Sequence, residues 1–238
     1  MRLFADPVPP AIDGIDLRCG DVADTLREVR GARLVVADPP WSYAREAGVA
    51  NPQTHEIYDG LSEAQIAAIL DASYDCAGPA CRLAVWYTFP KDAEWSAAGG
   101  AGPRWGARVS GGAWTKMLPT SEGARATEPG VGYHWRGRVE PVALFTVGAC
   151  GRQREVLHNG HVSQPGEHSE KPIEWMRAWL RAWTAPGDLV LDLFAGMAPL
   201  ARACLAEGRR YVGAEIDPAR HARAMAKLHN YRSTMEIR

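Results

Sequence analysis

The stretch that decides the fold is GDLVLDLFAGMAPLARACLAEGRRYVGAEID, which runs from Gly187 to Asp217. It opens with the apolar strand pattern LVLDLF (189–194) and turns into the helical pattern LARACLAEG (200–208). RYVGAEI (210–216) then predicts a second strand. A strand, a turn, a helix and a strand in this order predict neighbouring parallel strands, the unit of a doubly wound α/β sheet.

The same alternation of strand and helix precedes this stretch. RLVVA (33–37) is a continuous apolar run, which is typical of a strand buried on both faces of a parallel sheet. VEPVALFTVG (139–148) predicts a strand near the sheet edge, because Pro141 has no N–H to donate to a ladder. The other predicted elements are strands IDLRC (15–19) and RLAVWYT (82–88), and helices at VADTLREVR (22–30), after the capping box of Ser62 and Gln65, at KPIEWMRAWLRAW (171–183) and after Asp217-Pro218.

Length and composition indicate one domain. The chain has 238 residues, 46% of them hydrophobic, and a net charge of −1, so we expect a single catalytic domain over residues 1–238 with irregular basic insertions at about 95–132 and 149–168. Residues 101–158 contain eight Arg and Lys residues and four Glu but no Asp, which gives this region a formal charge of +4. The absence of a long apolar run or a secretory signal, together with five scattered cysteines, favours a reduced cytoplasmic protein without a membrane segment.

A glycine and an acidic residue in the opening stretch together favour a nucleotide-like ligand. The glycine of DLFAG, Gly196, lets a ligand approach the backbone beside a helix N-terminus. About twenty residues on, Glu215 follows the second strand, where a carboxylate can accept hydrogen bonds from ribose hydroxyls. Taken alone, this pair also fits a tight turn with a capping acid, or a nucleotide-binding oxidoreductase, although neither alternative explains the motif ADPPW at 37–41.

The complete set of motifs resembles a known family. ADPPW, the dipeptide GD at 20–21, GYHWRGRVEP (132–141), HSEKP (168–172) and the DLFAG and YVGAEIDP segments are similar to the S-adenosylmethionine-dependent amino-methyltransferases that act on adenine. The order of the motifs, with DPPW first and the cofactor turn last, resembles the beta-class DNA methyltransferases and the MT-A70-like family. The resemblance implies a Rossmann-like class I methyltransferase fold, with a seven-stranded, mostly parallel sheet and a circularly permuted motif order.

The resemblance also implies a reaction, the formation of N6-methyladenine in DNA, in a restriction-modification or phage setting. The exocyclic amine of adenine is a poor nucleophile because its lone pair is conjugated with the ring. By resemblance, the Asp38 carboxylate and the Pro39 carbonyl accept the two amine protons, Pro40 stiffens the loop, and Trp41 stacks on the base. The target base must be flipped out of a duplex or supplied in a single strand.

Further roles carry over from the family motifs. The residues implied in binding S-adenosylmethionine are Asp21 (adenine), Asp192, Phe194 and Gly196 (methionine part), Glu215 (ribose), Lys171 (carboxylate) and Asp38, which borders the transferred methyl group. The residues implied in contacting the nucleic acid are Trp41, Tyr43, Trp114, Lys116, Arg136 and Arg138, and Glu140 occupies the place of a glutamate in the family motif. The turn Gly196-Met197-Ala198-Pro199 departs from the family pattern, which has G-x-G. Alanine in place of the second glycine narrows the room beside the backbone.

Two alternatives remain open at this point. RNA is a second substrate class, and a catalytically inactive subunit that binds nucleic acid within a complex is a second kind of function. The chain is expected to be a monomer or a homodimer. A metal site is not expected, because the spacing of His158 and His161 falls across the turn Asn159-Gly160, and no carboxylate or cysteine lies at ligand spacing.

Overall fold

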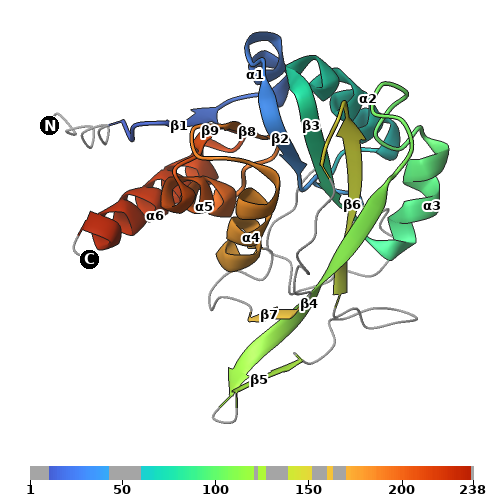
Figure 1. Ribbon diagram of the computed structural model, residues 1–238. Helices are drawn as coiled ribbons and strands as arrows, with labels where there is room; N and C mark the ends of the chain where they lie inside the picture. The colour runs from blue at the N-terminus through green and yellow to red at the C-terminus, as the bar shows by residue number, and fades with distance from the viewer. Residues whose placement is uncertain are drawn as a thin grey trace, which may run out of the picture.

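A computed structural model describes residues 11–42, 60–120, 123–126, 139–151, 160–162 and 170–236. Strands and helices alternate along most of the chain (Figure 1). Their bounds are β1 Ile15–Cys19, α1 Val22–Glu28, β2 Ala32–Ala37, α2 Glu63–Ser73, the 3-10 turn η1 Tyr74–Cys76, β3 Ala77–Trp86, α3 Phe89–Ala97, β4 Ser110–Thr120, β5 Gly123–Ala126, β6 Val139–Val147, β7 Gly160–Val162, α4 Ile173–Trp183, β8 Leu189–Asp192, α5 Pro199–Glu207, β9 Arg210–Glu215 and α6 Pro218–Glu236.

The strands form one mixed sheet in the order β1-β9-β8-β2-β3-β6-β4, and two short strands, β5 and β7, flank the end of β4. The first five strands are parallel, whereas β6 is antiparallel to both β3 and β4. The predicted seven-stranded, mostly parallel, Rossmann-like sheet is thereby confirmed. β6 has a partner on each side, and Pro141 is tolerated there because it lies one residue beyond the last β3–β6 pair and its carbonyl accepts the N–H of Tyr87.

Helices cover both faces of the sheet and bury two apolar layers. Alternate residues of β2 point to opposite faces: Leu34 and Val36 belong to the layer under α4, α5 and α6, and Val35 and Ala37 to the layer under α1, α2 and α3. This two-sided burial explains the continuous apolar run in the sequence. Within the part of the chain that the structure describes, no helix is long and apolar enough to cross a bilayer.

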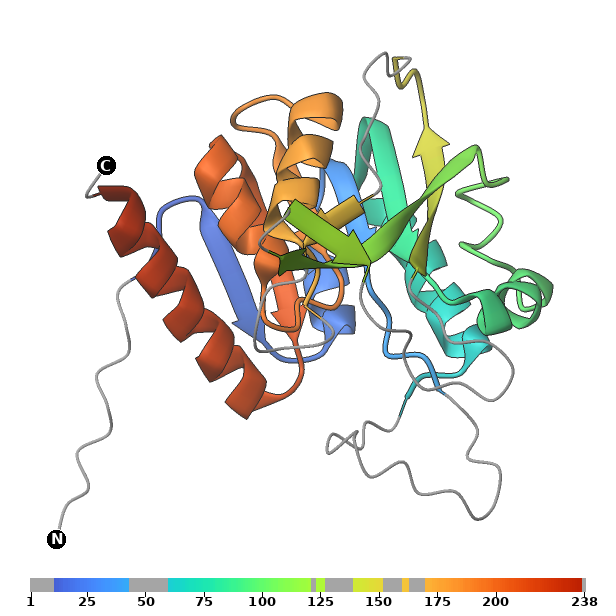
Figure 2. The ribbon, with the colours of Figure 1, turned by 90° about the horizontal axis from the view of Figure 1, so that it is seen from below.

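The chain order places a crevice at the centre of the sheet. β8 continues through α5 to β9 on one side, and β2 continues through α2 to β3 on the other, so the direction of winding reverses between the neighbouring strands β8 and β2. Open α/β sheets bind ligands at such a point, outside the carboxyl ends of the strands. We call this side of the sheet the carboxyl edge, and Figure 2 views the molecule from it.

β4 extends beyond this carboxyl edge. Its pairing with β6 ends at Thr115, and the next five residues, 116–120, continue with only the short strands β5 and β7 beside them. Five residues of strand span about 17 Å. β4 and β5 therefore lie nearest the viewer in Figure 2, and we call 116–120 and 123–126 with β7 the arm. Within the insertion predicted at about 95–132, the sequence allows only a short strand at GGAWTKM (111–117), whereas β4 is an 11-residue strand of the main sheet.

Candidate active site

The DPPW loop leaves the end of β2 and is fixed by backbone hydrogen bonds. Leu61 donates its N–H to the Pro40 carbonyl at 2.8 Å, and the Trp41 indole N–H donates to the carbonyl of Trp86 at 3.2 Å. The Pro39 carbonyl, expected to face the base, accepts the N–H of Trp41 at 2.9 Å. A carbonyl oxygen has two lone pairs, so one remains for a substrate amine.

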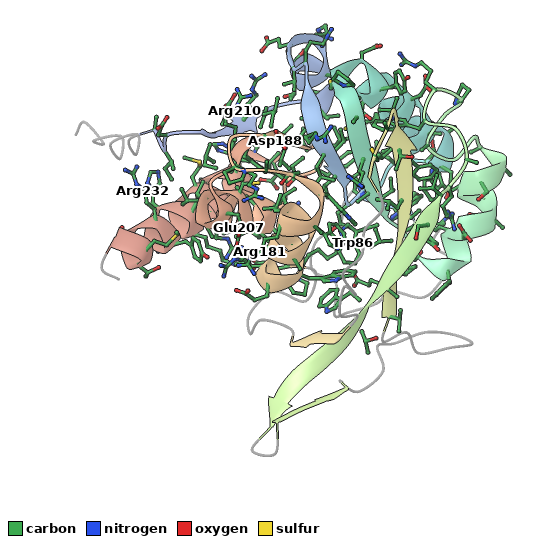
Figure 3. All side chains as sticks on the ribbon, in the orientation of Figure 1. Trp86, Arg181, Asp188, Glu207, Arg210 and Arg232 are labelled. Carbon is green, nitrogen blue, oxygen red and sulfur yellow. The ribbon has the colours of Figure 1, made fainter. Side chains whose placement is uncertain are left out.

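Lys171 lies between two carboxylates at the entrance of the crevice. Its Nζ is 2.6 Å from Oδ2 of Asp38 and 3.1 Å from Oε2 of Glu140, and it stands 5.0 Å from the ring centre of Trp86. Figure 3 labels Trp86 near the carboxyl edge. Burial by itself would lower the pKa of Lys171, but the attraction of Asp38 and Glu140 outweighs burial and raises that pKa. The ammonium is therefore permanently charged, and it holds Asp38 in one orientation.

Glu170, the residue before Lys171, forms ion pairs with the helices α5 and α6. Glu170 accepts from Arg202 of α5 and, at 2.8 Å, from Nζ of Lys227 in α6. Its side chain is 5% exposed, so its carboxylate is shielded from water. The dipeptide Glu170-Lys171 thus connects α5 and α6 to Asp38 of the DPPW motif.

Three strand ends meet around Glu215 at the carboxyl edge. One carboxylate oxygen of Glu215 accepts the N–H of Gly196 and the other accepts the N–H of Asp217, both at 2.9 Å. The Glu215 carbonyl accepts the N–H of Gly20, and the adjacent Asp21 caps α1 by accepting from Ala23. The residues expected at the ribose and the adenine of the cofactor therefore lie side by side.

Asp192 ends β8 and is buried. Burial raises the pKa of Asp192 to about 7, although its hydrogen bond from the Tyr211 hydroxyl at 3.0 Å favours the ionised form. The charges of Asp38 and Glu215 add to the increase. Because Asp192 pairs in register with Val36, two residues before Asp38, the two carboxylates lie on neighbouring strands at the same edge. A cationic group placed here would gain a carboxylate that titrates near neutral pH.

The turn Gly196-Met197-Ala198-Pro199 has left-handed backbone at two positions. Gly196 has φ +55° and Ala198 φ +52°, both left-handed, and Pro199 occupies the first turn of α5. For an alanine this conformation costs about 1–2 kcal/mol. No heavy atom lies within 4 Å of the position that a Cβ on Gly196 would take. The backbone of the turn is therefore open to a close-fitting ligand, and the residues present fit a nucleoside-containing cofactor.

Two sequence expectations need correction. Trp114 is fully buried against Trp86 and offers no exposed surface to nucleic acid. Lys171 was expected at the cofactor's carboxylate, but its ammonium is 7% exposed and pairs with protein carboxylates, as a buried charge requires. Lys116 lies in β4, but its side chain is outside the description, as are Tyr43, Arg136 and Arg138 and the proposed histidine spacing.

The sequence interpretation missed one apolar residue. Ile216 is 71% exposed although it directly follows the buried Glu215. An exposed branched side chain beside the carboxylate that is expected at the ribose suits the flat face of a nucleobase. The detectable signal was an isoleucine between two acids, at the point where the strand pattern ends.

Comparison with known proteins agrees with this architecture. The DNA methylase family matches residues 115–226 of this chain. The chain is 32% identical over 104 residues to the type II methyltransferase M.XycI of Xanthomonas campestris pv. cyanopsidis, an alignment that covers 43% of this chain and 34% of the relative. The chain spans about a third of the length of the curated relatives that it matches.

Solved structures of DNA methyltransferases share the fold. The M1.HpyAVI–SAM complex superimposes with a TM-score of 0.65 and 12% identity, covering 90% of this chain and 99% of that one. The cytosine-N4-specific PvuII DNA methyltransferase superimposes with a TM-score of 0.57 and 13% identity, covering 92% and 93%. The fold is that of the Rossmann-like methyltransferases. The sequence matches, each over less than half of the chain, are likewise to a DNA methylase family and to a type II methyltransferase.

Proposed function

We propose that this protein transfers a methyl group from S-adenosylmethionine to the N6 amine of adenine in DNA. The observation that carries the proposal is the juxtaposition of Asp38, fixed by Lys171, with the Asp192–Gly196 turn across the β8/β2 crevice. One carboxylate there has a permanent counter-ion, and the other titrates near neutral pH. This arrangement suits the transfer of a methyl group from a cationic cofactor to an electron-poor amine.

The cofactor half of the site would be held by groups that are already in place. Glu215 would accept from the ribose, Ile216 would cover the adenine with Asp21 beside it, and Asp192 would face the amino group of the methionine part. Phe194, half-buried beyond β8, would line the same turn with Gly196. When bound, S-adenosylmethionine supplies a sulfonium-activated methyl group.

The base half of the site orients and polarises the amine. The Asp38 carboxylate, together with the second lone pair of the Pro39 carbonyl, would accept the two amine protons and localise the nitrogen lone pair. Trp41 is half-buried, and its ring is held by its bond to Trp86 and by an edge contact with Trp95 at 5.7 Å, so it can offer a fixed stacking surface. Asp38 also receives the proton that the methylated nitrogen loses. Well-oriented reactants of this kind gain about 7–11 kcal/mol from positioning.

The arm supports nucleic acid as the substrate. It projects about 17 Å past the carboxyl edge, where a strand lying over the crevice would meet it. Lys116 and Arg125 belong to the arm, within the segment of local charge +4 that also contains Arg136 and Arg138. Phosphates are contacted by such residues without regard to base sequence. The resemblance of the DPPW motif and its surrounding motifs to adenine amino-methyltransferases is the feature that favours adenine.

The test is methyl transfer from radiolabelled S-adenosylmethionine to DNA, with RNA in a parallel reaction, followed by digestion and identification of the labelled nucleoside. We expect label in N6-methyladenine from DNA. Asp38→Ala should abolish transfer and leave cofactor binding, measured by calorimetry, largely unchanged. Label in N4-methylcytosine would overturn the adenine assignment, and label in RNA alone would overturn DNA as the substrate. Cofactor binding without any transfer would favour an inactive partner subunit.

A further inference from the structure

Exposed apolar side chains gather at the carboxyl edge. Five large hydrophobic residues are exposed in the described part of the chain, and three of them, Phe89, Val139 and Ile216, follow β3, begin β6 and follow β9 at this edge. Ile216 lies on the cofactor side of Asp38. Phe89, 64% exposed, lies on the other side, three residues after the carbonyl that anchors Trp41.

An unbroken series of aromatic rings leads from the DPPW motif to Phe89. Trp41 contacts Trp95 edge-on at 5.7 Å, Trp95 lies tilted against Tyr87 at 5.7 Å, and Tyr87 contacts Phe89 edge-on at 6.3 Å. The guanidinium of Arg108 covers Tyr87 at 4.8 Å from the ring centre. The inner rings are buried or half-buried, so the series presents one exposed ring, that of Phe89, on a rigid support.

The backbone beneath Phe89 is also fixed. Phe89 is the first residue of α3, and Lys91 of the same turn pairs with Glu63 of α2 at 2.6 Å while its N–H bonds to Thr88. The ring therefore cannot fold into the core without moving α3. A flat apolar ring that is held outward beside a base-binding loop can stack on an unpaired nucleobase, and such stacking tolerates any base.

We propose that Phe89 stacks on the base adjacent to the methylated adenine and so holds the substrate strand in register. This inference rests on the proposed function and adds a binding residue to the same site. Alanine substitutions at base-stacking aromatics weaken binding by about 5- to 150-fold per base. Because Phe89 is largely exposed, its removal should leave the fold intact.

The test compares Phe89→Ala, Phe89→Leu and Phe89→Trp in binding a fluorescent single-stranded oligonucleotide with one adenine, followed by anisotropy. We expect a loss of about 5- to 150-fold for the alanine variant, a similar loss for leucine, which keeps an apolar side chain, and recovery with tryptophan. Met235→Ala, at an exposed residue in the last turn of α6, is the matched control and should bind as the wild type does. Cofactor affinity and the melting temperature should not change in any variant.

A second substrate identifies the contact. Oligonucleotides with an abasic site next to the adenine should bind the wild type as weakly as Phe89→Ala binds the intact strand, and the two changes should not add. Unchanged binding by Phe89→Ala, or an equal further loss on the abasic strand, would overturn the inference. If Phe89→Ala binds the oligonucleotide as the wild type does but no longer pulls down a protein that the wild type pulls down, Phe89 contacts a protein partner. That result would also overturn the inference. A wild type that binds strands but methylates none would contradict the proposed function and leave this binding test decisive.

Discussion

Replacing Lys171 by methionine removes the ammonium between Asp38 and Glu140 and keeps an apolar side chain in its place. At an effective dielectric constant of about 20, its attraction to Asp38 at 2.6 Å is about 6 kcal/mol and to Glu140 at 3.1 Å about 5 kcal/mol. Dehydration of the buried ammonium offsets several kcal/mol, and water screens part of the Asp38 contribution because that side chain is 37% exposed. Removal of one partner from a buried pair typically costs about 3–5 kcal/mol, which is the loss of unfolding free energy that we expect at pH 8.

Urea denaturation at two pH values tests the cause of this loss. The raised pKa of Lys171 keeps it charged at pH 5 and pH 8, so the wild type keeps the pairs at both values. In Lys171→Met, the two facing carboxylates lose the ammonium between them, which raises their pKa values, so that they become protonated as the pH falls. The stability deficit of the variant should therefore be smaller at pH 5 than at pH 8.

A double variant serves as the control for this experiment. Adding Glu140→Gln to Lys171→Met removes one of the two repelling charges, so the double variant should be more stable than Lys171→Met at pH 8 and lose most of its pH dependence. An unchanged free energy of unfolding, or an equal deficit at pH 5 and pH 8, would refute the electrostatic role of Lys171.

Three further predictions concern the cofactor half of the site. Affinity for S-adenosylmethionine should rise about tenfold from pH 6 to pH 8, because Asp192 with a pKa of about 7 must ionise to face a cationic amino group, and Asp192→Asn should flatten this titration in calorimetry. Ala198→Gly should change the unfolding free energy by less than about 0.5 kcal/mol, because relief of the left-handed strain is offset by a lost buried methyl group and a more flexible unfolded chain. Gly196→Ala should lower the unfolding free energy by about 1–2 kcal/mol. A large gain in stability in Ala198→Gly would contradict this balance. Gly213→Ala places a Cβ 2.1 Å from the Tyr211 hydroxyl, so calorimetric melting should show a loss of about 1–3 kcal/mol together with weaker cofactor binding, and a variant as stable as the wild type would refute the contact.

Local patterns predicted most of the sheet, and β4 shows where they fail. Its sequence SGGAWTKMLPT contains two glycines and a proline, which favour a loop over a strand. The strand exists because β6 pairs with it from Ser110–Leu144 to Thr115–Val139, about thirty residues away along the chain. Such tertiary pairing leaves no periodic signal in a single sequence, so the sequence predicts at most a short strand at GGAWTKM and not the full length of β4.

The site was predictable to the extent that strand order determines it. Asp38, Asp192 and Glu215 each follow or end a parallel strand, and the carboxyl ends of parallel strands meet at one edge. The partner of Lys171 was not predictable, because a lysine in a loop can pair with a cofactor carboxylate or a protein carboxylate with the same local sequence. Folding brings Glu140 to it from the antiparallel strand β6, whose register the sequence does not specify.

The Asp38–Lys171 contact joins residues that are 133 positions apart, and the first strand of the sheet, β1, pairs with the last, β9. At a synthesis rate of about 5–20 residues per second, the aspartate leaves the ribosome about 7 to 27 seconds before its counter-ion. The central strand β8 is also translated late, after both of the strands that will flank the crevice on the base side. A nascent chain therefore has no assembled crevice until β8 and β9 have been made, which delays any binding in the crevice until the 133 residues from Asp38 to Lys171 and the strands beyond them have left the ribosome.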